Sequence, residues 1–127
     1  MNPAAEGTTY PEVPFVVDPV RVEAFRAVFG LAAGVPPTFV TAAEFAVLPQ
    51  VLGDPSLGVD FSRVVHGSQE YTYARPLVEG ETLSVRARID SVRTKGATGF
   101  LTVVMELFDA DGGLVCTARS QMVERAA

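Results

Sequence analysis

The chain has 127 residues, of which 48% are hydrophobic and 20% are charged, and its formal net charge is -5. Such a composition is typical of a folded globular protein, and the length fits one domain with a substantial core. The ten basic residues are scattered and form no broad basic patch of the kind that nucleic-acid binding requires. We therefore expect no nucleic-acid partner.

Residues 1–13 are small, polar and interrupted by proline. This pattern predicts an irregular N-terminal arm beside a single domain that covers residues 14–127. The start of the chain has neither a basic flank nor an apolar run, and no segment approaches the length needed to cross a bilayer. We expect a cytoplasmic protein with no membrane partner.

A short amphipathic helix is predicted after the arm. Asp18 supplies a helix cap, Pro19 suits the first helical position, and Gly30 ends the segment. The apolar residues between them recur at helical spacing: Val22, Phe25, Val28 and Phe29.

A second helix is predicted at residues 39–48, after a chain break at residues 34–38. It is apolar nearly all round, which indicates a buried helix. A loop follows it, marked by Pro49, Gly53, Pro55 and Gly58.

The second half of the chain is predicted to be antiparallel sheet. A strand begins near His66, and three longer segments with a period of two follow at residues 83–93, 100–108 and 114–123. The short, turn-like connections between the three segments force antiparallel neighbours. Segment 100–108 is apolar on both faces and should be central, whereas segment 83–93 alternates and should be half exposed.

One apolar helix followed by long antiparallel strands predicts an α+β fold in which the sheet wraps around the helix. A single helix cannot cover so much sheet, which leaves apolar surface for a second subunit. We therefore expect a dimer.

The single cysteine, Cys116, lies in an alternating apolar run and cannot form an internal disulfide, so we expect a buried thiol. The sequence has no cluster of cysteine and histidine ligands, no phosphate-binding glycine loop and no nicotinamide-binding fingerprint. We expect neither a metal nor a cofactor.

Several short motifs, taken together, resemble a known family. Pro-Pro-Thr-Phe at 36–39 leads into the second helix, and Val-His-Gly-Ser-Gln-Glu-Tyr at 65–71, Arg-Pro-Leu at 75–77 and Gly-Glu-Thr-Leu at 80–83 follow. This combination resembles MaoC-like hot-dog dehydratases and hydratases. It is most similar to their N-terminal-type subdomain and to the accessory subunits of mycobacterial-type (3R)-hydroxyacyl-ACP dehydratases. The resemblance covers residues 13–124 and implies a single hot-dog fold.

The chain departs from that family where the chemistry is expected. Catalytic members carry a segment resembling Gly-Asp-x-Asn-Pro-x-His between the two helices, whereas residues 31–35 here read Leu-Ala-Ala-Gly-Val. Neither the aspartate nor the histidine of that dyad has a counterpart, so no catalytic residue carries over. The resemblance implies an accessory subunit of a hydro-lyase, not catalytic alone, in the conversion of 3-hydroxyacyl to 2-enoyl thioesters.

The same resemblance implies the partners. The ligand would be an acyl-CoA or acyl-ACP thioester, and the protein partner would be a hot-dog subunit that carries the dyad, or otherwise a second copy of this chain. In related heterodimers the accessory hot dog shapes the acyl channel. By this analogy, four apolar residues are expected to line the channel: Phe39, Phe45, Val47 and Leu48.

His66 is the only histidine, so any imidazole chemistry must come from it. Its ordinary titration range suits a general base, but the sequence spacing fixes no orienting partner for the ring. The structural alternative, which we favour, is a hydrogen bond or cap at the entrance of the strand.

Glu44 is the second catalytic candidate. Some hot-dog thioesterases carry a carboxylate on the central helix, which would make this chain an acyl-CoA thioesterase by itself. The structural alternative is a capping box formed by Thr41 and Glu44, or a solvated glutamate. A third function, acyl binding without catalysis, also stays open.

Overall fold

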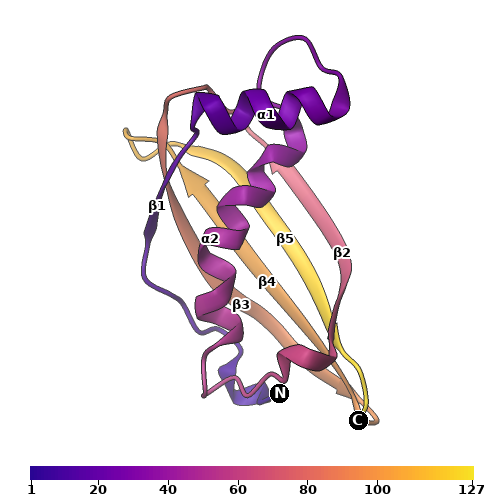
Figure 1. The fold of residues 1–127 in the computed structure, drawn as a ribbon. Coiled ribbons are helices and arrows are strands. Elements are labelled where there is room, and N and C mark those ends of the chain that lie inside the picture. The colour runs from indigo at the N-terminus through magenta and orange to yellow at the C-terminus, as the bar shows by residue number, and fades with distance from the viewer.

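A five-stranded antiparallel sheet forms the body of the molecule (Figure 1). The computed structural model describes residues 1–127. In spatial order the strands are β1 (Val13–Val16), β3 (Thr82–Lys95), β4 (Thr98–Phe108), β5 (Leu114–Glu124) and β2 (Val64–Tyr73). β4 is therefore central, and β1 and β2 are the two edges. The predicted antiparallel sheet and the α+β class are confirmed.

β4 is central because apolar residues cover both of its faces. Its core side carries Leu101, Val103, Met105 and Leu107, and Val104 on the opposite face is also buried. β3 instead alternates buried and more exposed residues along most of its length, as predicted for a half-exposed strand. Burial of the apolar surface of these strands supplies most of the driving force for folding.

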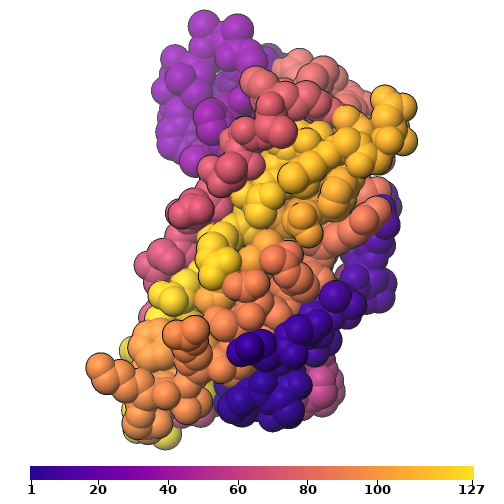
Figure 2. Space-filling model, turned by 180° about the vertical axis from the view of Figure 1, so that it is seen from behind, coloured from indigo at the N-terminus to yellow at the C-terminus, as the bar shows by residue number.

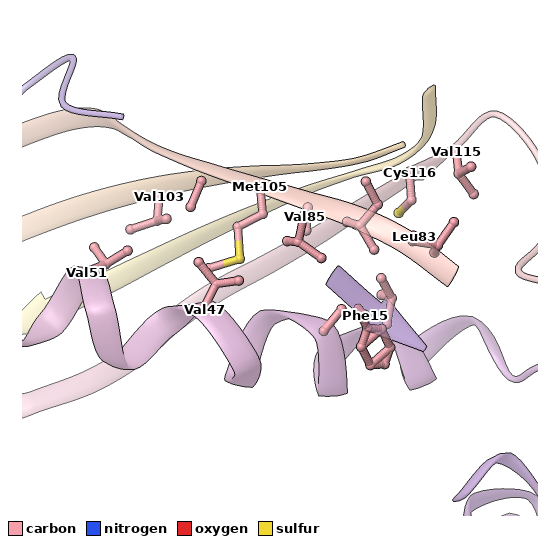
Figure 3. Close-up of a cluster of buried hydrophobic side chains, with 14 of the residues drawn as sticks. Phe15, Val47, Val51, Leu83, Val85, Val103, Met105, Val115 and Cys116 are labelled. Atoms are coloured by element: carbon pink, nitrogen blue, oxygen red, sulfur yellow. The ribbon is translucent and has the colours of Figure 1, made fainter. Parts of the chain in front are cut away.

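The helix α2 (Thr41–Leu52) lies across one face of the sheet (Figure 1). Figure 3 shows Val47 and Val51 of this helix pointing toward strand side chains such as Val103 and Met105. The other side of α2 faces outward, and Phe45 there is 64% exposed. The prediction of a helix buried nearly all round is therefore wrong for one face, because the sheet covers only one side of α2.

α2 continues through Pro49, where the sequence predicted a loop. A proline removes the N–H that would bond to the carbonyl of residue 45 and crowds that carbonyl. Phe45 lies on the outward side of the helix, where water can satisfy its carbonyl. The amide of Gly53 donates to the carbonyl of Pro49 at 2.9 Å and closes the last turn.

The helix α1 (Pro19–Phe29) begins and ends at the predicted residues. Asp18 Oδ1 accepts a hydrogen bond from the amide of Val20 at 3.0 Å, and Gly30 has a φ of 64°, in the left-handed region that favours glycine. Val28 is 78% exposed, contrary to its predicted place on the apolar face. α1 lies at one end of the molecule, so only a narrow stripe of it meets the core (Figure 1). No helix of the chain combines the length and the apolar character that spanning a membrane demands.

The segment before β1 runs along the edge of β3. It contains a short 3₁₀ helix, η1 (Pro3–Ala5), and main-chain hydrogen bonds join Gly7, Thr8 and Tyr10 to β3. β1 then continues along the same edge of β3. The sequence pattern predicts no strand here, because β1 has only four residues and contains Pro14, which hides the alternation.

The sheet face opposite α2 is not covered by a helix, as the view from behind shows (Figure 2). Charged side chains of β3, β4 and β5 pair with one another on this face. Arg88 lies 3.4 Å from Glu106 and 3.5 Å from Asp90, and Arg119 lies 3.0 Å from Asp90. Such alternating charges favour contact with water.

Candidate functional site

An apolar groove lies beside the C-terminal half of α2. It has a volume of about 440 Å³ and is lined by Phe45, Leu48, Pro49, Leu52, Gly53 and Phe61. The four helical residues from Phe45 to Leu52 share one face of α2, because residues three or four apart are neighbours on a helix surface. Phe61 belongs to the 3₁₀ helix η3 (Phe61–Arg63), which precedes β2. Phe45 and Phe61 are 64% and 68% exposed, so an apolar ligand could cover both rings.

Of the four residues expected to line an acyl channel, two line this groove and two are buried in the core. Phe45 and Leu48 line the groove. Val47 points into the core instead (Figure 3), and Phe39 is only 2% exposed. The ring of Phe39 lies 5.6 Å from that of Phe25, which links α1 to the segment before α2.

Glu44 is buried on the sheet side of α2, where it is 5% exposed. The hydroxyl of Tyr71 in β2 donates a hydrogen bond to one carboxyl oxygen. The hydroxyl of Ser120 in β5 donates to the other oxygen at 2.7 Å. Both oxygens therefore have partners, which compensates for the cost of removing this carboxyl from water.

The predicted capping box and the solvated position of Glu44 are both wrong. α2 has Val40 at its N-cap, without a side-chain cap. Thr41 Oγ1 instead lies 2.6 Å from the hydroxyl of Tyr71, so it joins the same hydrogen-bonded group as Glu44.

Two tyrosines tie the edge strand β2 to the segment around the start of α2. Tyr71 contacts Thr41 and Glu44, and Tyr73 donates to the carbonyl of Pro37. Burial is the main cause that raises the pKa of both phenols well above the ordinary value of about 10. Both hydroxyls therefore keep their protons and act as donors at neutral pH.

His66 lies on β2 and is exposed. Its Nε2 atom lies 3.0 Å from the carbonyl oxygen of Ser68, across the register shift that leaves Gly67 unpaired. This contact agrees with the expected hydrogen bond at the strand entrance. No carboxylate of the chain hydrogen-bonds or pairs with the ring, so nothing orients it as a general base.

Residues 31–35, which follow α1, form a loop without an acidic or basic side chain. Arg26 fixes this loop from α1, because its Nη1 atom donates to the carbonyl of Gly34 at 3.0 Å and also bonds to the carboxylate of Glu79. The loop contributes Ala32 and Val35 to a surface hollow of about 470 Å³. The charged residues of this hollow are Arg26 and Glu79, which bond to each other.

Sequence reasoning missed two members of the Glu44 group. Ser120 lies on the core side of β5 between Ala118 and Met122, and Gln69 Oε1 lies 2.7 Å from its hydroxyl. A polar residue at a core position of an alternating strand is the signal that predicts such a partner. Cys116, on the same side of β5, is buried as expected, and burial raises its pKa to about 11.

The antiparallel sheet packed against α2 defines the class of the protein as a hot-dog fold. A family model described as the FAS1-like dehydratase domain region matches residues 9–118. A UPF0336 protein of Leifsonia xyli subsp. xyli is 37% identical, over 98% of this chain and 96% of the relative. The chain belongs to the UPF0336 family, within the FAS1-like dehydratase region.

Two solved structures show the shared fold. The HadBC (3R-hydroxyacyl-ACP dehydratase) complex of Mycobacterium tuberculosis superposes with a TM-score of 0.79 at 21% identity, over 94% of this chain and 96% of the matched chain. A MaoC-like dehydratase superposes with a TM-score of 0.82 at 22% identity, over 98% of this chain but only 43% of the other. At these identities the likeness concerns the fold alone.

Proposed function

We propose that the chain is the accessory, substrate-binding subunit of an acyl-thioester dehydratase or enoyl hydratase. It would work with a hot-dog partner that carries the Asp/His dyad, in the cytoplasm, on 3-hydroxyacyl and 2-enoyl thioesters of coenzyme A or an acyl carrier protein. The hot-dog dehydratase class of the chain supports this reaction.

One observation carries the accessory role. Adding or removing water at the double bond of a thioester needs an acid and a base matched near neutral pH. The only imidazole, on His66, lies exposed on an edge strand against a backbone carbonyl, and no carboxylate orients it. The loop at the position of the dyad has neither group. On this proposal the acid and base come from another chain.

The groove beside α2 supports the substrate-binding part of the role. Its lining is apolar, and Phe45 and Phe61 present their rings to solvent. An alkyl chain that covers these rings gains free energy in proportion to the apolar area it buries. The substrate residues that we retain are therefore Phe45 and Leu48, joined by Leu52 and Phe61.

The free edge of β2 supports a second subunit. Only β5 pairs with β2, and ten residues of β2 present their other side to no strand of this chain. An edge of this length without lysine or proline is suited to pairing with another chain. The HadBC neighbour is itself a complex of hot-dog subunits, which is consistent with a heterodimer.

The thioesterase alternative is disfavoured by the position of Glu44. A carboxylate nucleophile or base must reach the thioester or a water molecule. Glu44 is buried, and both of its oxygens accept hydrogen bonds from hydroxyls of the protein. Its geometry is that of a structural group which joins α2 to β2 and β5.

Affinity capture of the chain from its own cells tests the proposal. The expected result is a stoichiometric hot-dog partner with an Asp/His dyad, and a purified pair that hydrates 2-enoyl thioesters while neither subunit does so alone. Replacing the partner's histidine should abolish turnover, whereas His66→Ala in this chain should preserve it. Recovery of this chain only with itself, or hydrolysis of acyl-CoA that Glu44→Gln abolishes, contradicts the proposal.

A further inference from the structure

Two segments of the chain meet at the apolar groove. One is the C-terminal part of α2 with Gly53 after it, and the other is η3, which contributes Phe61 alone. The loop that joins them, residues 54–60, supplies no lining residue. The shape of the groove therefore depends on how η3 is held beside α2.

Glu124 holds η3 from the end of β5. Its side chain is buried, and the residue is 7% exposed. Oε2 accepts a hydrogen bond from the amide of Asp60 at 2.6 Å. Oε1 lies 3.9 Å from Nη2 of Arg63 and 3.8 Å from the amino group of Met1. The carboxyl group therefore contacts the residue just before η3 and the last residue of η3.

Further hydrogen bonds fix the chain on both sides of Phe61. Asp60 Oδ1 accepts from the amide and the hydroxyl of Ser62, at 3.0 and 2.6 Å, and Oδ2 accepts from Nε of Arg63 at 3.0 Å. The carbonyl of Arg63 accepts from the amide of Arg125 at 2.9 Å. The main chain of Phe61 is thus held between two fixed neighbours, and the freedom that remains is rotation of its side chain.

The ring that these contacts hold in place is 68% exposed. Burying a carboxyl group costs free energy unless it is hydrogen-bonded, and the bond that compensates here goes to the segment that carries Phe61. An alkyl chain that binds against the ring does not have to order the main chain of η3. Less of its binding free energy is therefore lost to conformational entropy.

We propose that Glu124 is a positioning residue of the groove, which fixes Phe61 for contact with the alkyl chain of the ligand. The inference rests on the proposed acyl-binding function and adds to it a residue outside the groove. Glu124 is not among the lining residues, so it acts through Phe61 and does not touch the ligand.

A double-mutant cycle between Glu124 and Phe61 tests this proposal, by calorimetry on the full chain with decanoyl-CoA as the probe. Phe61→Ala should lower the affinity about tenfold, because the contact with the ring is lost. Glu124→Ala should lower it about three- to tenfold, because binding must then order η3. In the Phe61→Ala background, Glu124→Ala should have no further effect. Additive losses overturn the proposal.

Glu6→Ala is the matched control. Glu6 Oε2 also accepts a hydrogen bond from the main-chain amide of a distant residue, Val92 of β3, at 3.1 Å. Glu6→Ala should reduce the stability of the chain but leave the affinity for decanoyl-CoA unchanged. A loss of affinity as large as that of Glu124→Ala overturns the proposal, because it would then follow from reduced stability alone.

Two further variants cover the case in which Glu124→Ala does not fold. Glu124→Gln keeps an oxygen that can accept from the amide of Asp60, and it should keep most of the affinity. Arg63→Ala removes the bond to Asp60 from a side chain that is 33% exposed. It should lower the affinity about threefold, and only while Phe61 is present. An effect of Arg63→Ala that persists in the Phe61→Ala background overturns the proposal.

Decanol as a second probe separates this inference from the proposed function, because it has an alkyl chain but neither a thioester nor coenzyme A. Coupling between Glu124 and Phe61 with decanol, in a chain whose complex does not hydrate 2-enoyl thioesters, supports the positioning role and contradicts the dehydratase role. An active complex in which the two residues show no coupling supports the dehydratase role and contradicts the positioning role. Failure of both probes to bind overturns the inference.

Discussion

The two edges of the sheet are protected in different ways. The edge of β3 is covered by main chain, because β1 and the arm residues Gly7, Thr8 and Tyr10 pair with it in turn. β1 itself is short and contains Pro14, which limits further pairing. β2 has ten residues, no proline and no lysine, and no strand beyond it.

The difference bears on which edge would bind the proposed second subunit. The β1 edge is closed by the chain's own backbone. The β2 edge is held from inside by side chains of Tyr71 and Tyr73, which reach the segment around the start of α2, and its outer side stays open. A strand that is held firmly in place but has a free edge is a prepared surface for a second subunit.

The largest effect is expected from removing the carboxyl that holds β2 from inside. Glu44→Ala removes the buried carboxyl to which the hydroxyls of Tyr71 and Ser120 donate, so the free energy of unfolding should fall by about 2–4 kcal/mol. Urea denaturation measures the loss, and hydrogen exchange should become faster in β2 but not in β1. Glu44→Gln keeps an acceptor oxygen and should lose less. Equal acceleration in both edge strands contradicts the comparison.

A charge on each edge tests which one binds a partner. Val65→Lys places a lysine on β2, where Val65 is 42% exposed, and Val16→Lys makes the same change on β1, where Val16 is 52% exposed. Val65→Lys should weaken subunit association about tenfold or more, because a lysine on an edge strand opposes pairing. Val16→Lys should leave association unchanged. Sedimentation velocity over a concentration series decides between the two edges.

Acid should weaken the connection that follows β2. Arg75 donates to both carboxylate oxygens of Glu81, at 2.7 and 3.0 Å, and these bonds are the main cause that lowers the pKa of Glu81. The stabilisation is complete above the ordinary glutamate pKa of about 4.3 and is lost as the pH falls through the lowered value. The urea midpoint should therefore decline below about pH 4, and Glu81→Gln should flatten that decline. A slope unaffected by Glu81→Gln assigns the acid sensitivity to other carboxyls.

The smallest effect is expected at His66. His66→Ala removes an exposed contact with the carbonyl of Ser68, so the free energy of unfolding should fall by less than about 1 kcal/mol. Turnover of the reconstituted complex should change even less. A normally folded variant that loses turnover selectively would make His66 a catalytic residue.

Much of the fold is predictable because its signals are local. Asp18 and Gly30 mark the ends of α1 through their own backbone preferences, and the alternation in β3, β4 and β5 is long enough to read. β1 is not predictable in this way, because its four residues form a strand only through pairing with β3, which is distant in sequence. The last turn of α2 is missed because a proline normally ends a helix, whereas α2 continues through Pro49.

The candidate site is less predictable because its contacts are distant in sequence. Glu44 bonds to Tyr71, 27 positions away, and to Ser120, 76 positions away. The residues next to Glu44 in the sequence do not tell whether its carboxyl is buried against the sheet or forms a capping box at the start of the helix. Among the expected channel residues, Phe45 and Val47 lie two positions apart, so a helix turns their side chains to opposite sides. The sequence around them, apolar on both sides, does not tell which of the two faces the sheet.

Because Cys116 is buried, the native chain has no thiol that reacts readily with thiol-specific labels. Thiol reagents react with the thiolate, and this only native cysteine is enclosed with its pKa raised to about 11. A cysteine introduced at Val65 or at Val16 would thus be the sole reactive thiol. One fluorophore or spin label can then report on either edge of the sheet in the purified chain, without removal of its native cysteine.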